Sequence, residues 1–472
     1  LYHISIYDMN NINDGITLKH WFKVVEKIEQ FDSRRESNKF GKDQALAYAV
    51  YEIRKSFEEY KIYMAYFYNR FYVYTDDYWN EIKDDKIEIF IRDCCKKIYI
   101  SDINFHTSSF YRALKDTFRD DLRIIPDTDD DKILLNCSNA TLEFNKKGFA
   151  QREHNIEDYL TYKLNYDYDE NETCPRWDNF LNEMLPDATH QLLLHQYIGY
   201  AFTNHLKLEK ALFLYGDGGN GKSVVQEVIT KLLGKENTSS VSIGKLTKDP
   251  NTIILIEGKL LNYCSENEKT LDITMFKTLV SGEPVLGKKL YSDVRTVSNY
   301  AKLMFNMNSL PDIKDESQSF VRRLLILKFD KKPKRVDPEL HFKIIADELG
   351  GIFNRVLSAL TVLLKDKKFV YYKELDETLN QYKYENDVVQ QFIDEVHETG
   401  FPNGPTKVSE IHTIYVAFCG RHQELRLSLT SFAKELIKKG YKKIIRKDGT
   451  YYDLRVVVGG SSFDETFENL EF

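Results

Sequence analysis

The spacing of hydrophobic and polar residues divides the first part of the chain into helices and one hairpin. Residues 1–125 show amphipathic helical spacing, for example over Lys42–Tyr66 and Asn80–Lys97. Over Ile133–Gly148, an apolar strand, a polar turn and a second alternating strand predict a short hairpin. Helical spacing returns between Arg176 and Leu208. The dense Tyr and Phe residues near the N-terminus favour core packing over a base-stacking surface.

The second part of the chain begins with a different pattern. Residues 210–330 alternate short apolar strands with helices, which is typical of a parallel sheet built from βαβ units. Residues 338–398 are helical. Residues 400–458 predict two helices and then two strands, which turn at Lys447-Asp448-Gly449. That layout is typical of a winged helix-turn-helix.

These patterns predict a multi-domain α/β protein with an N-terminal α-helical domain, a central domain with a mostly parallel sheet, and a C-terminal winged helix. The segments expected are 1–130 (mainly helical), 131–208 (hairpin and helices), 209–335 (central core), 336–399 (helical lid), 400–458 (winged helix) and 459–472 (tail).

Composition limits the class of protein. The chain has 472 residues, 42% hydrophobic and 29% charged, which is typical of a globular protein with several domains. Its net charge of −7 means that any nucleic-acid binding must come from local basic patches. The 6 cysteines show no C-x-x-C spacing, which indicates a reducing compartment and argues against a structural zinc site. No apolar run approaches the ~20 residues that span a bilayer. Because the sequence begins with Leu1, we expect it to be part of a longer polypeptide.

The most specific motif lies in Ala211–Gly234, where an apolar strand and an amphipathic helix flank G-x-x-x-x-G-K-[ST]. Glycines allow backbone N–H groups to turn inward as an anion nest, at a helix N-terminus that favours negative charge. The lysine places its charge on the β- and γ-phosphates, and the serine hydroxyl binds Mg²⁺. We therefore predict ATP and Mg²⁺ as ligands. The predicted ATP-binding residues are Gly216, Asp217, Gly218, Gly219, Asn220, Gly221, Lys222 and Ser223.

A site of this kind also needs a carboxylate at the end of a neighbouring strand, to hold Mg²⁺ and polarise water. The apolar strand Leu260–Cys264 is followed by two candidates, Glu266 and Glu268, of which Glu266 is favoured. A second apolar strand ends near Asn308, whose amide would orient the attacking water.

Two adjacent arginines, Arg322 and Arg323, precede a further buried strand. In a ring ATPase, an arginine at this place reaches the γ-phosphate bound by the neighbouring subunit. We favour Arg323 for this role, because it lies next to the buried Leu324, and expect Arg322 to pair with a carboxylate.

Taken in order, these motifs resemble those of superfamily 3 helicases, which are AAA+ ring motors. The resemblance is to the branch shared by poxvirus primase-helicases and phage or plasmid primase-helicases, and it covers about residues 70–455. The matching segments are GDGGNGKS at 216–223, the strand and SENE at 260–268, the B′-like segment at 271–291, the motif C-like segment at 301–311 and the arginine segment at 319–329.

The resemblance implies an AAA+ core and Mg²⁺-dependent ATP hydrolysis in a homo-hexamer. It also implies 3′→5′ movement on single-stranded DNA and unwinding of forked duplexes during viral, phage or plasmid replication. Polymerase, primase or other replisome proteins are the expected partners, in the cytoplasm of the host. Primase chemistry is not expected, because residues 1–130 show no paired-carboxylate primase site.

Two places are candidates for DNA contact. The resemblance implies a DNA-gripping hairpin at about Val285–Val297, where lysines suit phosphates and a tyrosine can stack on a base. The tail offers a basic run that would contact phosphates, unless the winged helix docks a protein instead. The predicted DNA-binding residues are Lys288, Lys289, Tyr291, Arg295, Lys438, Lys439, Lys442 and Lys443.

Two other functions compete with a helicase. An ATP-dependent initiator would melt or remodel DNA without processive unwinding, and a strand-displacement assay on a forked duplex separates it from a helicase. A DNA-binding adaptor would have an inactive ATP site. The intact Lys222, Ser223 and Glu266 argue against the adaptor.

Overall fold

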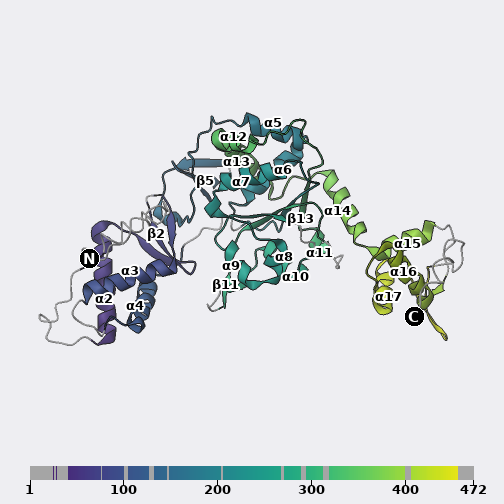
Figure 1. The fold of residues 1–472 in the computed structure, drawn as a ribbon, viewed down its shortest axis with the longest axis horizontal. Helices are drawn as coiled ribbons and strands as arrows, with labels where there is room; N and C mark the ends of the chain where they lie inside the picture. Colours follow the sequence, from purple (N-terminus) through teal and green to yellow (C-terminus); the bar gives the residue numbers. More distant parts are fainter. Residues whose placement is uncertain are drawn as a thin grey trace.

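The computed structural model describes Val25, Ile28 and residues 41–454 except 76, 100–104, 127–131, 146–147, 204–205, 267–269, 289–293, 312–317 and 399–404. Three units follow one another along the long axis (Figure 1): an N-terminal unit (41–126), a central unit (132–386) and a C-terminal unit (387–454). No helix in these described ranges is long and apolar enough to cross a membrane.

The N-terminal unit combines three helices with a three-stranded sheet that the sequence did not predict. Its elements are α2 (Lys42–Tyr60), β1 (Met64–Phe67), β2 (Arg70–Tyr74), β3 (Trp79–Ile82), α3 (Asp84–Ile98) and α4 (Ser108–Asp121). The antiparallel sheet β1-β2-β3 is an addition to the predicted helices. Helix α2 ends at Tyr60, before the end of the helical spacing at Tyr66, and the turn residues Tyr68 and Asn69 both have left-handed φ values, of 48° and 60°. Such a two-residue turn matches the twist of a hairpin.

Many aromatic residues of this unit pack in its interior, which fits the predicted core packing, although Tyr51, Tyr63 and Tyr68 are exposed. Phe57 stacks on Phe90 with ring centroids 6.1 Å apart, and Phe67 stacks on Tyr72 at 4.2 Å. All four side chains are buried. These rings therefore stabilise the core and do not form a base-stacking surface.

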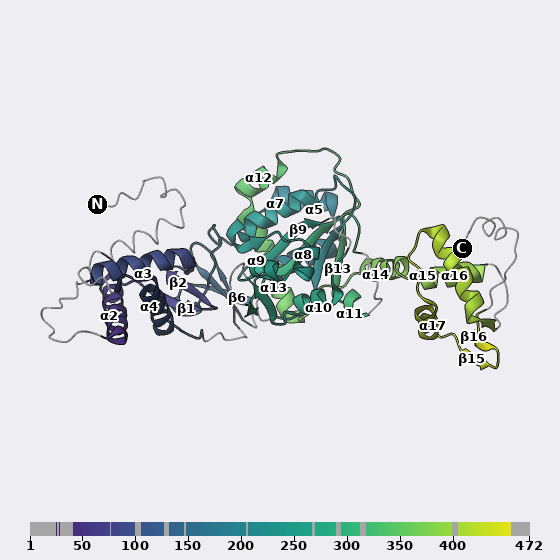
Figure 2. The same cartoon turned by 60° about the horizontal axis from the view of Figure 1, so that its bottom comes forward.

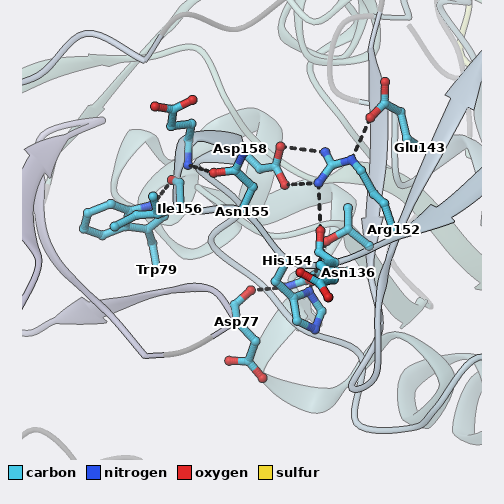
Figure 3. A network of polar contacts seen from close by, with 12 residues as sticks. Asp77, Trp79, Asn136, Glu143, Arg152, His154, Asn155, Ile156 and Asp158 are labelled. Carbon is cyan, nitrogen blue, oxygen red and sulfur yellow. Dashed lines mark hydrogen bonds and ion pairs between the residues drawn. The ribbon is translucent and has the colours of Figure 1, made fainter.

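A junction of polar contacts joins the N-terminal unit to the central unit (Figure 3). The Trp79 indole N–H donates to the carbonyl of Ile156 at 2.9 Å, and the Asn136 amide donates to the carbonyl of Asp77 at 2.9 Å. On the central side, Arg152 makes a bidentate pair with Asp158, with N–O distances of 2.7 and 2.8 Å. Each unit thus donates one hydrogen bond to a backbone carbonyl of the other. The Arg152–Asp158 pair fixes the segment next to Ile156 that receives one of them.

The central unit is built on a five-stranded, wholly parallel sheet with strand order β13-β7-β12-β9-β8. The strands are β7 (Ala211–Tyr215), β8 (Thr238–Ser239), β9 (Leu261–Glu266), β12 (Lys302–Met307) and β13 (Leu324–Lys328). In register, Lys328 pairs with Tyr215, Tyr215 with Met307, and Met307 with Glu266. The carboxyl ends of four strands are therefore level at one edge, and the mixed α/β core with a mostly parallel sheet is confirmed.

Helices cover both faces of this sheet, and in Figure 1 α5 and α12 lie above it and α8 and α10 below it. The helices are α5 (Pro175–Met184), α6 (Ala188–Tyr200), α7 (Lys222–Leu233), α8 (Ile243–Lys248), α9 (Ile253–Ile256), α10 (Ile273–Ser281), α11 (Gln318–Val321), α12 (Leu340–Asp347), α13 (Leu349–Asp366) and α14 (Lys373–Glu385), with short 3-10 turns at Ile156–Asp158, Lys235–Asn237 and Pro250–Thr252.

One hydrophobic core runs from Leu135 to Tyr382, so residues expected in three successive segments pack together. The predicted hairpin is present as β4 (Ile133–Asn136) and β5 (Thr141–Asn145), and β6 (Gly148–Arg152) adds a third strand. A further antiparallel pair, β10 (Val285–Lys288) and β11 (Val294–Val297), forms the second predicted hairpin.

The C-terminal unit has its own core around Phe392, Tyr415 and Phe432. Figure 2 shows it beyond α14, at the end of the molecule opposite the N-terminal unit. The two predicted helices and the hairpin are present, and a short strand adds to the sheet, whose order is β14-β16-β15. The elements are α15 (Val388–Glu398), β14 (Thr406–Lys407), α16 (Val408–His422), α17 (Leu429–Lys438), β15 (Lys443–Arg446) and β16 (Gly449–Tyr452).

Candidate nucleotide-binding site

The loop between β7 and α7 is enclosed by the elements around it. Gly216 has φ 153°, and a Cβ there would lie 2.2 Å from the carbonyl oxygen of Phe329. Gly221 has φ 81°, and its Cβ would lie 2.8 Å from the ring of Phe180 on α5. The Gly216 N–H donates to the carbonyl of Met307 at 3.1 Å. Glycine is thus required at both ends of the loop, for conformation and for space.

Lys222, the first residue of α7, points back into this loop. Its ammonium donates to the carbonyl of Gly216, to the carbonyl of Asp217 at 2.9 Å and to the Asn220 side-chain oxygen at 2.9 Å. Burial lowers the pKa of Lys222. Asn220 is itself buried and donates to the carbonyl of Phe329. The loop therefore surrounds one fixed positive charge at a helix N-terminus, which is a place for an anion.

The other predicted loop residues lie around this charge. Asp217, Gly218 and Gly219 are exposed, and Ser223 is exposed in the first turn of α7, next to Lys222. The open side of the loop thus carries the serine hydroxyl, whereas the Lys222 stem is buried.

The carboxyl edge of the sheet brings the other candidates to the loop. Glu266 is the last residue of β9 and pairs in register with Met307, and Asn308 follows β12 and is exposed. The loop begins at the same level, directly after Tyr215. Glu268 and the side chain of Glu266 lie outside the described residues. The backbone of the predicted acidic strand end and that of the predicted amide therefore both adjoin the loop.

A polar cluster behind the loop, in which Tyr263 and Asn306 are buried, is absent from the sequence predictions. The Asn306 side-chain amide donates to the Gln226 oxygen at 3.0 Å, and the Ser265 hydroxyl donates to the same oxygen at 2.7 Å. The Tyr263 hydroxyl donates to the Asn306 side-chain oxygen at 2.8 Å, and burial raises the pKa of Tyr263. An asparagine inside the apolar strand 302–307 is the signal that could have pointed to this cluster. The cluster joins α7, the helix after the loop, to β9, the strand that ends in Glu266.

The two arginines lie at the opposite edge of the sheet, because β13 begins at Leu324, level with Ala211. The Arg323 side chain is 9% exposed and lies 2.9 Å from the Glu209 carboxylate, and it also donates to the Ser281 hydroxyl at 2.9 Å. The Arg322 side chain is 65% exposed and 3.7 Å from Glu209. Both arginines thus lie within ion-pair distance of Glu209, Arg322 as expected, and Arg322 is the more exposed of the two.

On the hairpin β10–β11, the side chains alternate between two faces. Leu286 and Lys288 are exposed, whereas Arg295 lies on the inward face opposite Gly287 and pairs with Glu257. Arg295, predicted as a DNA contact, thus makes an ion pair within its own chain, and its contact with DNA stays a prediction. Lys289 and Tyr291 lie outside the described residues.

The basic run of the tail is also divided. Lys439, predicted as a DNA contact, has a side chain that is 12% exposed and pairs with Asp387, so it connects α17 to the start of α15. The Lys438 side chain is 71% exposed and pairs with Glu435 at 2.6 Å. Lys442 and Lys443 are exposed. Burial, which the sequence does not reveal, separates Lys439 from its neighbours.

The fold and loop define a parallel α/β protein with a P-loop-like site. Among protein families, a model described as "D5 N terminal like" matches residues 53–186, and one described as "Family of unknown function (DUF5906)" matches residues 214–323. Together these two models match parts of both the N-terminal and the central unit.

Two curated viral proteins are similar to the chain. "Putative helicase 121R" of Invertebrate iridescent virus 3 is 27% identical over 221 residues, which are 43% of this chain and 23% of that protein. "Putative primase C962R" of African swine fever virus is 24% identical over 285 residues, 53% of this chain and 29% of that protein. The matches thus span less than a third of either relative's length. With the family models, they confirm the predicted resemblance to primase-helicases.

A solved structure, the apo C-terminal region of NrS-1, covers 86% of this chain and 98% of its own, with 13% identity and a TM-score of 0.49. A likeness at this level carries no functional argument.

Gly216→Ala tests the enclosed loop. We expect it to weaken binding of a non-hydrolysable ATP analogue by roughly tenfold or more, about 1.4 kcal/mol, because the methyl group meets a backbone carbonyl. Gly218→Ala is the control, since a Cβ there meets nothing within 4 Å. Calorimetric titration measures both. Equal affinities would contradict the loop geometry as a ligand cradle.

Proposed function

We propose that the chain is an ATP-driven DNA helicase of viral, phage or plasmid replication. The single observation that carries this proposal is the enclosed charge of Lys222, in a loop level with the ends of β9 and β12. The similarity to viral proteins named as helicase and primase supports a role in replication.

The residues of the loop fit a nucleoside triphosphate and Mg²⁺. Backbone N–H groups of 217–221 and the Lys222 ammonium would hold the phosphates, and the Ser223 hydroxyl and Glu266 would hold Mg²⁺. The metal would neutralise negative charge on the phosphate oxygens. The fit is supported by the tight packing at Gly216, which excludes a Cβ as a phosphate-binding loop does, and by the exposure of Ser223.

For hydrolysis, Glu266 would accept a proton from the attacking water, and Asn308 would orient that water. The cluster of Gln226, Ser265 and Asn306 supports this assignment, because it fixes the strand before Glu266 against the loop helix. Glu268 is the second candidate for the carboxylate.

The position of Arg322 and Arg323, at the amino edge of the sheet, supports a site shared between subunits of an AAA+ ring. Arg322 is exposed and lies at the amino edge of the sheet, away from the loop of its own chain. A head-to-tail contact repeated around a closed ring, here a homo-hexamer, would bring this edge to a neighbour's loop. We propose Arg322 as the arginine that completes the neighbouring site, and Arg323 as the residue that positions its backbone.

DNA would be held at two places. The exposed Lys288, with Lys289 and Tyr291 next to it in the sequence, would grip a single strand inside the ring, and 3′→5′ movement is the direction that the resemblance implies. The C-terminal unit would act as a winged helix, with Lys442 and Lys443 toward phosphates. The order β14-β16-β15 and the two-residue turn between β15 and β16 support that assignment.

Lys222→Ala tests the proposed function directly. ATP turnover should fall by ~10²-fold or more, because the charge that faces the phosphates is lost. Glu266→Gln should still bind nucleotide but hydrolyse it slowly, as measured by phosphate release and by analogue binding. Wild-type turnover in Lys222→Ala would refute the proposal. A dead Glu268→Gln beside an active Glu266→Gln would move the carboxylate to Glu268.

Mixed subunits test the shared site. Arg322→Ala should bind ATP normally yet lose ~10³-fold in turnover, as expected for an arginine finger. Mixing it with Lys222→Ala should restore part of the activity, because some interfaces then join an intact loop to an intact arginine. No rescue at any ratio, with both variants inactive alone, would contradict a site shared between subunits.

Paired lysine substitutions test the tail. Lys442→Ala with Lys443→Ala should weaken DNA binding more at low salt than at high salt, and reduce the salt slope by about 0.7–0.9 per lost phosphate contact. Lys365→Ala with Lys368→Ala removes the same charge from exposed positions at the end of α13 and serves as the control. An unchanged slope, measured by fluorescence anisotropy, would assign the C-terminal unit to protein docking.

A further inference from the structure

One carboxylate, that of Glu257, receives arginines from two different parts of the molecule. Arg295 of β11 donates to both of its oxygens, at 2.6 Å for the first. Arg70 of β2, in the N-terminal unit, lies 2.6 Å from the second oxygen. The side chains of Glu257, Arg70 and Arg295 are 10%, 21% and 30% exposed. A contact shared by three groups in so little solvent is geometrically restrictive.

Glu257 is itself held firmly by the central unit. It follows α9, its backbone pairs with Tyr300, and the next N–H, that of Gly258, donates to the carbonyl of Asn299 at 3.0 Å. The backbone of Glu257 is therefore fixed in the central unit, and its carboxylate holds the side chains of Arg295 and Arg70 in place.

The hairpin side of this contact determines which way the hairpin faces. Arg295 shares the inward face with Gly287, where a Cβ would lie 2.8 Å from Ile254 of α9. Because strand side chains alternate, fixing Arg295 inward turns Lys288 outward. The orientation of the DNA-facing lysine thus depends on the anchor at Arg295.

The N-terminal side adds a second constraint. Arg70 also pairs with Glu81 of β3, so it is held by its own sheet while it reaches Glu257. In Figure 1, β11 and α9 lie on the side of the central unit nearest the N-terminal unit. Moving the sheet β1-β2-β3 would withdraw one of the two cations that neutralise Glu257, and would change how Arg295 is held.

We propose that Glu257 is a positioning residue for the DNA hairpin, and that through Arg70 the N-terminal unit sets the hairpin's orientation. The functional half of this proposal rests on the proposed helicase function. The N-terminal unit is then part of the DNA grip without contacting DNA at this point, and its docking tunes how strongly DNA stimulates ATP turnover.

The experiment uses the full chain and two readouts. Hydrogen–deuterium exchange of β10 and β11 reports the hairpin, and ATP turnover with and without single-stranded oligonucleotide reports its use. In Arg70→Gln and in Glu257→Gln, hairpin exchange should accelerate by roughly tenfold. DNA-stimulated turnover should fall by roughly fivefold, whereas basal turnover stays unchanged.

Arg54→Gln is the matched control, because Arg54 is in the same unit but pairs with Asp121 of that unit, at 3.0 Å. It should leave both readouts at wild-type values. Arg70→Gln added to Glu257→Gln should produce no further change, which distinguishes a shared contact from general destabilisation of the N-terminal unit.

Wild-type hairpin exchange in both Arg70→Gln and Glu257→Gln would overturn the proposal, as would additive effects in the double variant. If exchange changes as expected but DNA stimulates no variant, nor the wild type, the positioning contact stands and the helicase function fails.

Discussion

The register of the parallel sheet is the constraint on which the rest of the molecule depends. Because Tyr215, Met307 and Glu266 are level, the loop after β7 and the residues after β12 and β9 converge within one edge. A slip of one residue would turn every side chain of the displaced strand to the other face. It would also break the contact from the Gly216 N–H to the Met307 carbonyl, which sets the start of the loop.

Polar groups inside this sheet give the register its specificity. Apolar strands such as 303–305 would pack almost as well one position along, whereas Asn306 finds Gln226, Ser265 and Tyr263 in one register alone. An unpaired buried amide costs about 1–3 kcal/mol, which is enough to disfavour a shifted strand. The cluster therefore contributes less to overall stability than to the choice among similar packings, and that choice places Glu266 and Asn308 beside the loop.

The sequence predicted what depends on neighbours along the chain, and failed where burial decides. The loop, its flanking strand and helix, and the hairpins of β4–β5 and β15–β16 follow local patterns, and the structure contains them. The hairpin β10–β11 was expected only from the resemblance. The strands β1–β3 were not predicted, because aromatic residues such as Tyr66 and Phe71 suit helical and strand spacing alike. The left-handed turn at Tyr68 and Asn69 also contains no glycine that would have indicated it. Lys439 and Arg295 looked like exposed cations, since nothing nearby in sequence reveals Asp387 or Glu257 as their partners.

The same sheet also keeps both arginines away from the nucleotide loop of their own chain. Strands rise by about 3.3 Å per residue, so the five residues of β7 separate the two edges by ~16 Å, several times the length of a hydrogen bond. Arg322 therefore lies far from the loop of its own chain, while Arg323 is held by Glu209 and Ser281 at the same edge. The different exposure of these adjacent arginines follows from their contacts. Arg323 is fixed by contacts within its own chain, and Arg322 is left exposed at the edge where the proposed ring would place a neighbouring subunit.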